Sequence, residues 1–207
     1  KGISDYGVFM VDTLKAFGEL LTYTLDYNGF QSERVFFRFF EKAPSNLQPQ
    51  LVLFDPSGNI LINTWGQVGV KQSVQMPVTG TYTFWISSLG GQETGEFYLN
   101  MQRTIQPSRA IEISQSDTYT NSLDFPGDFQ TYSIMIPEAN GENLSVTMTE
   151  KAPSDIQPSI TLYSPSGVQL GSTWGQQSAT VNVAVNDPGA YTLMAHTLND
   201  ELTGSYD

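Results

Sequence analysis

The sequence predicts an all-β protein made of two tandem, jelly-roll-like β-sandwich domains. A long stretch of sequence occurs twice, which indicates two equivalent domains. Turn-forming residues recur about every 8–12 residues, which is the spacing expected for a β-sandwich. No segment shows the apolar periodicity of an amphipathic helix. Together, these observations indicate short strands separated by turns in two related halves.

The repeat covers more than one motif. Residues 41–67 read EKAPSNLQPQLVLFDPSGNILINTWGQ, and residues 150–176 read EKAPSDIQPSITLYSPSGVQLGSTWGQ, so the numbering offset is 150 − 41 = 109. The same offset places Gly80–Thr83 on Gly189–Thr192 without a gap. A period of this length corresponds to a whole domain rather than a solenoid unit. We therefore expect one domain at residues 1–104 and a second at 105–207, joined by a short connection.

The first copy begins with an apolar run, Val8, Phe9, Met10 and Val11, whose equivalents in copy two are polar. A buried helix in one copy does not fit a polar strand in the other, so we expect a strand here, with continuous apolar character typical of burial on both faces. Trp85 is expected to belong to the core. Further strands of copy one are predicted at Tyr23–Tyr27, Val35–Phe40, Leu51–Phe54, Ile60–Ile62, Val74–Met76, Tyr82–Ile86 and Phe97–Met101.

Turns and strands follow the same order in copy two. Proline presets φ and glycine accepts positive φ, so Asp55–Gly58 predicts a hairpin turn. The equivalent strands of copy two are predicted to begin at Ile111 and Ile113 and continue at Tyr132–Ile136, Leu144–Met148, Ile160–Tyr163, Thr180–Val185 and Tyr191–Ala195. Tight-turn conformations, some with positive φ, are expected at Gly58, Gly80, Gly167 and Gly189. The last strand of copy one is matched only by Gly204–Asp207, so we expect a truncated last strand in copy two.

Several motifs recur in the same order in both copies. TLKAFGELLTYTL (13–25) and SLDFPGDFQTYSI (122–134) lead through a glycine-acidic turn into an aromatic strand. LVLFDPSGNIL and ITLYSPSGVQL form a central hairpin, GTYTFWIS and GAYTLMAH a Gly-x-Tyr strand, and TGEFYLNM closes copy one. This order resembles bacterial pre-peptidase C-terminal domains over most of both copies.

The resemblance implies a β-sandwich of eight or nine strands, attached in that family to secreted peptidases, glycan-active enzymes and surface proteins. Some relatives bind collagen or polysaccharide, and some bind calcium. The chain departs from the family in one loop: Thr-Trp-Gly-Gln replaces the usual acidic Asn-Asp segment after the hairpin in both copies. The shared motifs are structural, so they specify the fold better than the function.

Composition excludes several classes of partner. Nine Lys and Arg residues oppose 21 Asp and Glu residues, for a net charge of −12, which disfavours nucleic acid and anionic membranes. The absence of Cys excludes disulfides and thiolate metal sites. No run of about 18 apolar residues exists to insert into a membrane. Because the chain begins at Lys1, we interpret it as a mature secreted or cell-surface protein or as a fragment.

We expect no catalytic site. The single histidine, His196, lies in a predicted strand near a domain end, and a structural hydrogen bond is its expected role. Cofactors are not expected, and no metal site is assigned, but calcium stays an open alternative because carboxylates cluster near the start of each copy. These carboxylates are Asp5, Asp12 and Glu19 in copy one and Glu112, Asp117, Asp124 and Asp128 in copy two.

Trp65-Gly66-Gln67 and Trp174-Gly175-Gln176 are the candidate ligand-binding residues. An exposed Trp stacks on a sugar face, and a neighbouring Gln hydrogen-bonds sugar hydroxyls. The structural alternative is that each Trp caps the end of its sandwich, packed on the repeated turns at residues 41–44 and 150–153. A structural role is the more common fate of such a residue.

Two functions remain open. One is a self-assembling structural or adhesive subunit, in which Val8, Phe9, Met10 and Val11 of one copy fill the open edge of the second domain in the next copy. This donor-strand arrangement produces a homo-polymer, an extracellular fibre or array. The contrary expectation for this segment is that residues 1–12 pair within their own domain. The alternative is a polysaccharide- or matrix-binding accessory module of a secreted hydrolase.

Overall fold

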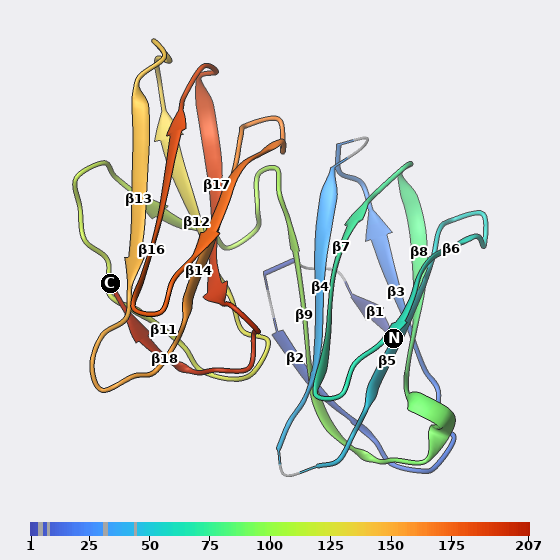
Figure 1. Cartoon of the computed structure of the whole chain (residues 1–207). Helices are drawn as coiled ribbons and strands as arrows, with labels where there is room; N and C mark the ends of the chain where they lie inside the picture. Colours follow the sequence, from blue (N-terminus) through green and yellow to red (C-terminus); the bar gives the residue numbers. More distant parts are fainter. Residues whose placement is uncertain (4–5, 8, 31–32, 44) are drawn as a thin grey trace. The chain divides into compact units, whose positions relative to one another are not determined.

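The computed structural model describes residues 1–3, 6–7, 9–30, 33–43 and 45–207. They form two compact units, Lys1–Arg103 and Thr104–Asp207 (Figure 1). Apart from one short 3-10 turn, η1 (Leu89–Gly91), every regular element in these residues is a β-strand, which confirms the predicted all-β class. None of the described segments is a helix long and apolar enough to span a membrane.

Unit 1 consists of two mainly antiparallel sheets. One has five strands in the order β1-β3-β8-β5-β6, and the other has four in the order β2-β9-β4-β7. Its strands are β1 (Gly2–Ile3), β2 (Phe9–Leu14), β3 (Leu21–Tyr27), β4 (Arg34–Glu41), β5 (Pro49–Phe54), β6 (Ile60–Trp65), β7 (Gly69–Gln75), β8 (Gly80–Ser88) and β9 (Gly95–Arg103). Each strand predicted for copy one is present.

The core of unit 1 is rich in aromatic side chains. Alternate residues of each strand point inward, so β8 buries Tyr82, Phe84 and Ile86 completely. The ring of Tyr23 stacks on Phe84 with a centroid separation of 5.3 Å. Each large apolar side chain buried in this way contributes about 1.5–3 kcal/mol to folding. This period-two pattern is what made the strands recognisable in the sequence.

Unit 2 repeats the five-stranded sheet. The order β10-β12-β17-β14-β15 matches that of unit 1, and the same β-bulge recurs at the equivalent positions Leu53/Phe54 and Leu162/Tyr163. The strands of unit 2 are β10 (Ile111–Ile113), β11 (Asn121–Leu123), β12 (Gln130–Ile136), β13 (Asn143–Thr149), β14 (Pro158–Tyr163), β15 (Gln169–Trp174), β16 (Ser178–Ala184), β17 (Gly189–Thr197) and β18 (Gly204–Tyr206).

The second layer differs between the units. Unit 2 has two separate two-stranded sheets, β13-β16 and β11-β18, where unit 1 has a continuous four-stranded sheet. The reason is the length of the strand between them, since β18 has three residues and its equivalent β9 has nine. Tyr206 bridges to Glu150, the register that Phe97 and Glu41 have in unit 1. Beyond Tyr206, only Asp207 continues the ladder, through two backbone hydrogen bonds with Thr149 of 2.8 and 2.9 Å.

The N-terminal apolar run differs in part from expectation. Phe9, Met10 and Val11 belong to strand β2, as predicted, and β2 pairs with β9 of its own unit; Val8 lies outside the described residues. The prediction that this strand is buried on both faces is wrong, because Phe9 and Val11 are 50% and 43% exposed. β2 is the edge strand of a sheet that packs through one face only, so alternate side chains face solvent.

Two repeated turns hold the hairpins together. Gly58, Gly80, Gly167 and Gly189 have φ values of 86°, 142°, 79° and 136°, which confirms the predicted positive-φ turns. A Cβ added at Gly80 would lie 2.8 Å from the ring of Pro56. Two residues later, the Tyr82 hydroxyl donates a 2.6 Å hydrogen bond to the Val78 carbonyl. The Gly-x-Tyr and Pro-Ser-Gly motifs therefore recur together because they pack on each other.

Gly80→Ala should destabilise unit 1 by about 1–3 kcal/mol, because alanine disfavours positive φ and its methyl group would strike Pro56. The free energy of unfolding from urea denaturation provides the measurement. Gly2→Ala is the control, since its Cβ would meet only one atom, at 3.9 Å, and should change stability by less than about 0.5 kcal/mol. Equal effects of the two changes would contradict the role of Gly80.

Candidate functional site

Each Trp-Gly-Gln motif forms a corner where the chain passes from the five-stranded sheet of its unit to a sheet of the second layer. Trp65 is the last residue of β6, and the next strand, β7, belongs to the other sheet. The Gly66 N–H donates a 3.0 Å hydrogen bond to the Pro49 carbonyl. A Cβ on Gly66 would lie only 1.8 Å from the Gly69 carbonyl oxygen, so only glycine permits this corner. Gly175 makes the same approach to a carbonyl in unit 2, at 1.9 Å.

Both corner tryptophans are open to solvent. Trp65 is 50% exposed and Trp174 is 54% exposed, and Gln67 and Gln176 beside them are also exposed. An indole that closed the end of a sandwich would be buried, so the structure does not support that alternative. Pro44 of the turn on which Trp65 was expected to pack lies outside the described residues. The four candidate ligand-binding residues are therefore accessible in both units.

Polar side chains lie directly beside Trp65. Gln50 of β5 pairs with Trp65 on one side and with Ser87 of β8 on the other, so all three project from the outer face of the sheet. The Ser87 hydroxyl donates a 3.3 Å hydrogen bond to the Gln50 side-chain oxygen. That bond uses the amide oxygen and not the amide NH₂. Trp65 therefore has amide and hydroxyl groups within reach of any ring stacked on it.

The prediction that Trp85 belongs to the core is wrong. Its neighbours Phe84 and Ile86 are buried, so alternation along β8 turns Trp85 to the outer face, where it is 39% exposed. It packs edge-on against Phe54, with ring centroids 4.5 Å apart. Thr81, Thr83 and Ser87 share the parity of Trp85, so the alternation along the strand indicated the outer face, and sequence analysis misplaced Trp85 because it did not use this signal.

His196 occupies the position in unit 2 that Ser87 has in unit 1. Its Nδ1 atom lies 2.7 Å from the Thr197 carbonyl and 2.8 Å from a carboxylate oxygen of buried Asp200. Its Nε2 atom lies 3.4 Å from the Ser159 hydroxyl. Ser159, the second residue of β14, is buried, so this hydroxyl is not presented to a substrate. The imidazole thus links neighbouring strand and loop groups, as expected of a structural histidine.

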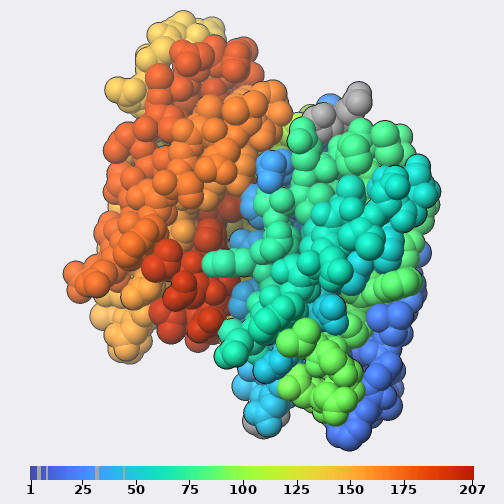
Figure 2. Space-filling model, turned by 45° about the vertical axis from the view of Figure 1, so that its right-hand side comes forward, coloured from blue at the N-terminus to red at the C-terminus, as the bar shows by residue number. Residues whose placement is uncertain are grey.

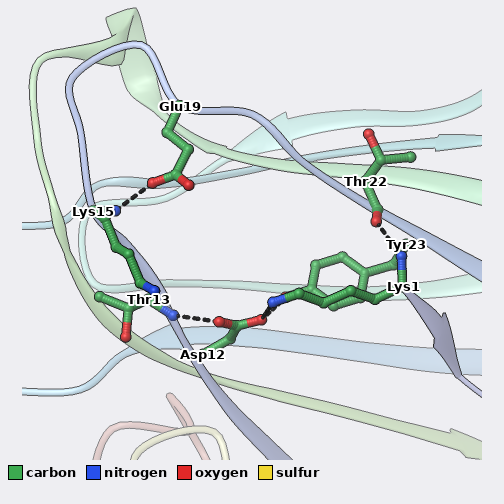
Figure 3. Close-up of polar contacts among 7 residues, drawn as sticks. All are labelled: Lys1, Asp12, Thr13, Lys15, Glu19, Thr22 and Tyr23. Atoms are coloured by element: carbon green, nitrogen blue, oxygen red, sulfur yellow. Dashed lines mark hydrogen bonds and ion pairs between the residues drawn. The ribbon is translucent and has the colours of Figure 1, made fainter.

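The acidic residues of copy one have protein partners instead of converging. Asp12 accepts hydrogen bonds from Lys1, from the Tyr23 hydroxyl at 2.5 Å and from its neighbouring backbone N–H (Figure 3). Burial raises the pKa of Asp12, but these hydrogen bonds outweigh it and lower the pKa overall. Glu19 accepts the backbone N–H group of Lys15 (Figure 3) and also that of Ala16. Asp5 lies outside the described residues.

The acidic residues of copy two also serve the turns. Asp128 accepts the Asp124 backbone N–H at 2.9 Å, as Glu19 does from Lys15 in the equivalent turn of copy one. Burial raises the pKa of Asp128 to about 6. Asp117 accepts a hydrogen bond from the Tyr119 hydroxyl. Among the described residues, no three His, Cys, Asp or Glu side chains gather to hold a metal ion.

Unit 2 also contains an open groove in its second layer. The groove has a volume of about 180 Å³ and is lined mainly by apolar side chains, including Ile113, Tyr132, Leu144, Val146, Met148 and Tyr206. In unit 1, Phe37 and Phe39 of β4 pair with Met101 and Leu99 of β9, both buried. Val146 and Met148 are the equivalents of Phe37 and Phe39. The groove therefore lies where the C-terminal half of β9 lies in unit 1.

Asp128→Asn tests the cost of burying this carboxylate. A pKa of about 6, above the ordinary 3.8, means that the folded protein favours the protonated form. Its stabilising contribution is complete below pH 3.8 and is lost as the pH rises through 6. The free energy of unfolding should therefore fall by up to about 3 kcal/mol between pH 4 and 7.

The substitution should remove most of this fall in urea denaturation at a series of pH values. Asp187→Asn is the control, because Asp187 is exposed, and it should retain the fall. A pH dependence that Asp128→Asn leaves unchanged would show that another group causes it.

Comparison with known proteins shows weak likenesses to β-sandwich domains. No protein-family model and no curated protein matches the chain. The pre-peptidase C-terminal domain of a collagenase from Bacillus anthracis is 13% identical with a TM-score of 0.37, over 49% of this chain and 92% of that one. The PBSX exported protein XepA is 12% identical with a TM-score of 0.35, over 96% and 86% of the two chains.

A tandem CBM22 domain of Xyn10C from Paenibacillus barcinonensis is 10% identical with a TM-score of 0.29, over 97% of this chain and 89% of that one. The first of these three structures belongs to the family that the sequence motifs resemble. Likenesses at this level carry no statement of function. The β-sandwich fold rests on the strand order and register of the chain itself.

Proposed function

We propose that the protein is a non-catalytic, extracellular module that binds polysaccharide through its two Trp-Gly-Gln corners. The observation that carries this proposal is the equivalent exposure of Trp65 and Trp174, 50% and 54%, at the same place in both units. Burial would have contributed to stability. Neither indole is used in that way, although the corner that presents it is built identically twice.

The chemistry of the corner suits a sugar. A pyranose ring has an apolar face of C–H groups and a rim of hydroxyls, and an indole offers a flat apolar surface of similar size. Gln67 and Gln176, exposed beside the two indoles, supply both a hydrogen-bond donor and an acceptor. Such a site binds by stacking and hydrogen bonding, and it requires no reactive group.

Charge favours a neutral polysaccharide. With a net charge of −12, the chain repels polymers that carry carboxylate or sulfate groups. Two sites on one chain strengthen retention on a polymer when both engage, because the second binding event is intramolecular. Structural polymers of this kind, such as cellulose and chitin, lie outside cells, and binding to one of them agrees with a secreted or cell-surface location.

Trp65→Ala and Trp174→Ala test the proposal by retention on insoluble cellulose, chitin and xylan. Each single variant should weaken retention on the polymer that binds, and the double variant should abolish it. The melting temperature should stay nearly unchanged, because half of each indole is already in water. Phe17→Ala is the matched control, since this aromatic side chain is 75% exposed elsewhere on unit 1.

Retention of the double variant at the level of the unmodified protein would overturn the proposal. Loss of about 3 kcal/mol or more of unfolding free energy in either single variant would instead identify that Trp as a packing residue.

A second candidate function, assembly by strand addition, is favoured by the groove of unit 2. Along Leu144–Met148, the described residues pair β13 with β16 on one side only. A strand edge of this kind, next to an apolar groove, accepts an extended segment through backbone hydrogen bonds. We propose that a second copy of the chain supplies that segment, and a head-to-tail contact of this type propagates into a fibre unless it closes into a ring.

The N-terminal segment was the expected donor. Phe9–Val11 are paired with β9 of their own unit, so donation would require β2 to exchange partners. The exchange would break the six residue pairs between β2 and β9, and the energy lost with them opposes assembly through β2. The candidate therefore ranks below the polysaccharide-binding function.

Self-complementation tests whether the groove accepts a strand. Leu99–Arg103 of β9, with sequence LNMQR, fills the equivalent place in unit 1. Adding this pentapeptide after Asp207 should raise the free energy of unfolding of unit 2 by about 3 kcal/mol, because two apolar side chains become buried. It should also prevent any fibres formed by the unextended chain, as seen by electron microscopy.

The control is the same extension with both apolar residues replaced by Asp, which should have neither effect. An LNMQR extension without effect on stability would show that the groove accepts no strand. Persistence of fibres despite a stabilising extension would show that assembly uses another surface.

A further inference from the structure

We propose that the outer face of the five-stranded sheet in unit 1 is an extended platform for several consecutive rings of a neutral polysaccharide chain. Its aromatic groups are Trp65, Trp85 and Phe54, hereafter the platform. This inference rests on the proposed polysaccharide-binding function and deepens it. Trp85 joins the site as a second stacking residue, and unit 1 becomes the principal binding unit.

Strand register places the two indoles on one face. Trp65 is opposite Gln50, and Trp85 is opposite Val52, two residues farther along β5. Side chains opposite each other in a ladder share a face, so both indoles project outward from the same sheet. With strands about 4.8 Å apart and a rise of about 3.4 Å per residue, their Cα atoms are about 12 Å apart. One sugar ring cannot reach both indoles, so each stacks on a different ring.

Phe54 prepares Trp85 for binding. Their rings meet edge-on at 4.5 Å between centroids and at an interplanar angle of 65°. Aromatic pairs in this arrangement contribute about 0.5–1.5 kcal/mol, which favours one orientation of the indole. A side chain that is already ordered loses less conformational entropy when a ligand binds.

The groups between the aromatics are uncharged. Gln50, Ser87 and Asn63 lie on the same face, next to Trp65 or in the row of Trp85. Strands β3, β5, β6 and β8 contain no Lys or Arg in their sequences LTYTLDY, PQLVLF, ILINTW and GTYTFWISS. Their one carboxylate, Asp26, accepts a 2.6 Å hydrogen bond from Thr81. These four strands therefore present amide and hydroxyl groups suited to sugar hydroxyls, and none of them supplies a Lys or Arg to an acidic sugar.

Exposure gives this face the character of a binding surface. Ile60 and the two indoles are 58%, 50% and 39% exposed, so three large apolar side chains stand in solvent on one sheet face, and exposed apolar groups gathered on one face mark interaction sites. In Figure 2, atoms coloured cyan to green, the colours of residues 50–90, lie on the forward surface of unit 1; these residues include β5, β6 and β8 of this sheet and β7 of the other. A flat surface of aromatic, amide and hydroxyl groups matches a polymer chain better than a compact ligand.

Unit 2 does not repeat the platform. The equivalent of Trp85 in the second copy is Met194, which is buried. The positions of Val52 and Asn63 are taken by Thr161 and Ser172, whose hydroxyls hydrogen-bond to each other at 2.9 Å. Among the described residues, Trp174, the equivalent of Trp65, is the one aromatic side chain exposed on this face of unit 2. Unit 2 therefore contacts a single ring through its corner, while unit 1 contacts several.

The test measures affinity against ligand length. Soluble cello-, chito- and xylo-oligosaccharides, from the disaccharide to the hexasaccharide, are titrated calorimetrically against the full chain and its Trp65→Ala, Trp85→Ala and Trp174→Ala variants. Affinity should rise with length in the unmodified protein. Trp85→Ala should lower the affinity for the hexasaccharide about tenfold and remove most of the dependence on length. Trp85→Phe should restore much of both, and Trp174→Ala should leave the dependence on length intact.

Each alternative result has a distinct meaning. A Trp85→Ala variant with unchanged length dependence, alongside a weakened Trp65→Ala variant, overturns the platform but leaves the corner function intact. Failure of the unmodified protein to bind any of these sugars, soluble or insoluble, overturns both proposals. Capture of a purified matrix protein such as collagen that depends on Trp85, without sugar binding, would identify the face as a protein-docking surface and also overturn the platform.

Discussion

The register of β6, β5 and β8 is the constraint on which the core and the candidate site both depend. Successive side chains of a strand point to opposite faces, so burying Leu51 and Leu53 turns Gln50, Val52 and Phe54 outward. A shift of one residue would place indoles in the core and aliphatic side chains in water. The hydrophobic energy that fixes the core therefore also fixes the composition of the outer face, although that face contributes little to stability.

Glycines set where this register begins and ends. Gly80 starts β8 pressed against Pro56, and Gly66 turns the chain at the end of β6, where any side chain would strike a carbonyl oxygen. These contacts are backbone requirements that recur unchanged in unit 2. They explain why the most similar segments of the two copies are turns and corners, while exposed residues between them differ. The repeated frame leaves its outer surface free to vary.

The two units have used that freedom differently. Unit 1 has an exposed aromatic face with Trp85, whereas unit 2 has Met194, which is buried, at the position of Trp85. A shared corner with Trp65 or Trp174 remains in both. In the proposed function, unit 1 supplies an extended contact with the polysaccharide and unit 2 supplies one additional contact. The tandem repeat therefore binds the polymer more tightly than either unit alone, although its two sites are not identical.

The sequence by itself determined the all-β class, the repeat offset, the hairpin turns with positive φ and the candidates Trp65 and Trp174, because these depend on local residue chemistry and on a period of two. It did not determine which parity of the continuous apolar run in β2 faces inward, so the outer side chains of β2 were misplaced. Trp85 was misplaced although Thr83 and Ser87 share its parity in the sequence. It also grouped carboxylates that the fold separates, since each satisfies a turn or a neighbouring side chain of its own. Only the tertiary structure decided these points, because facing and convergence depend on which strands pair and in what register.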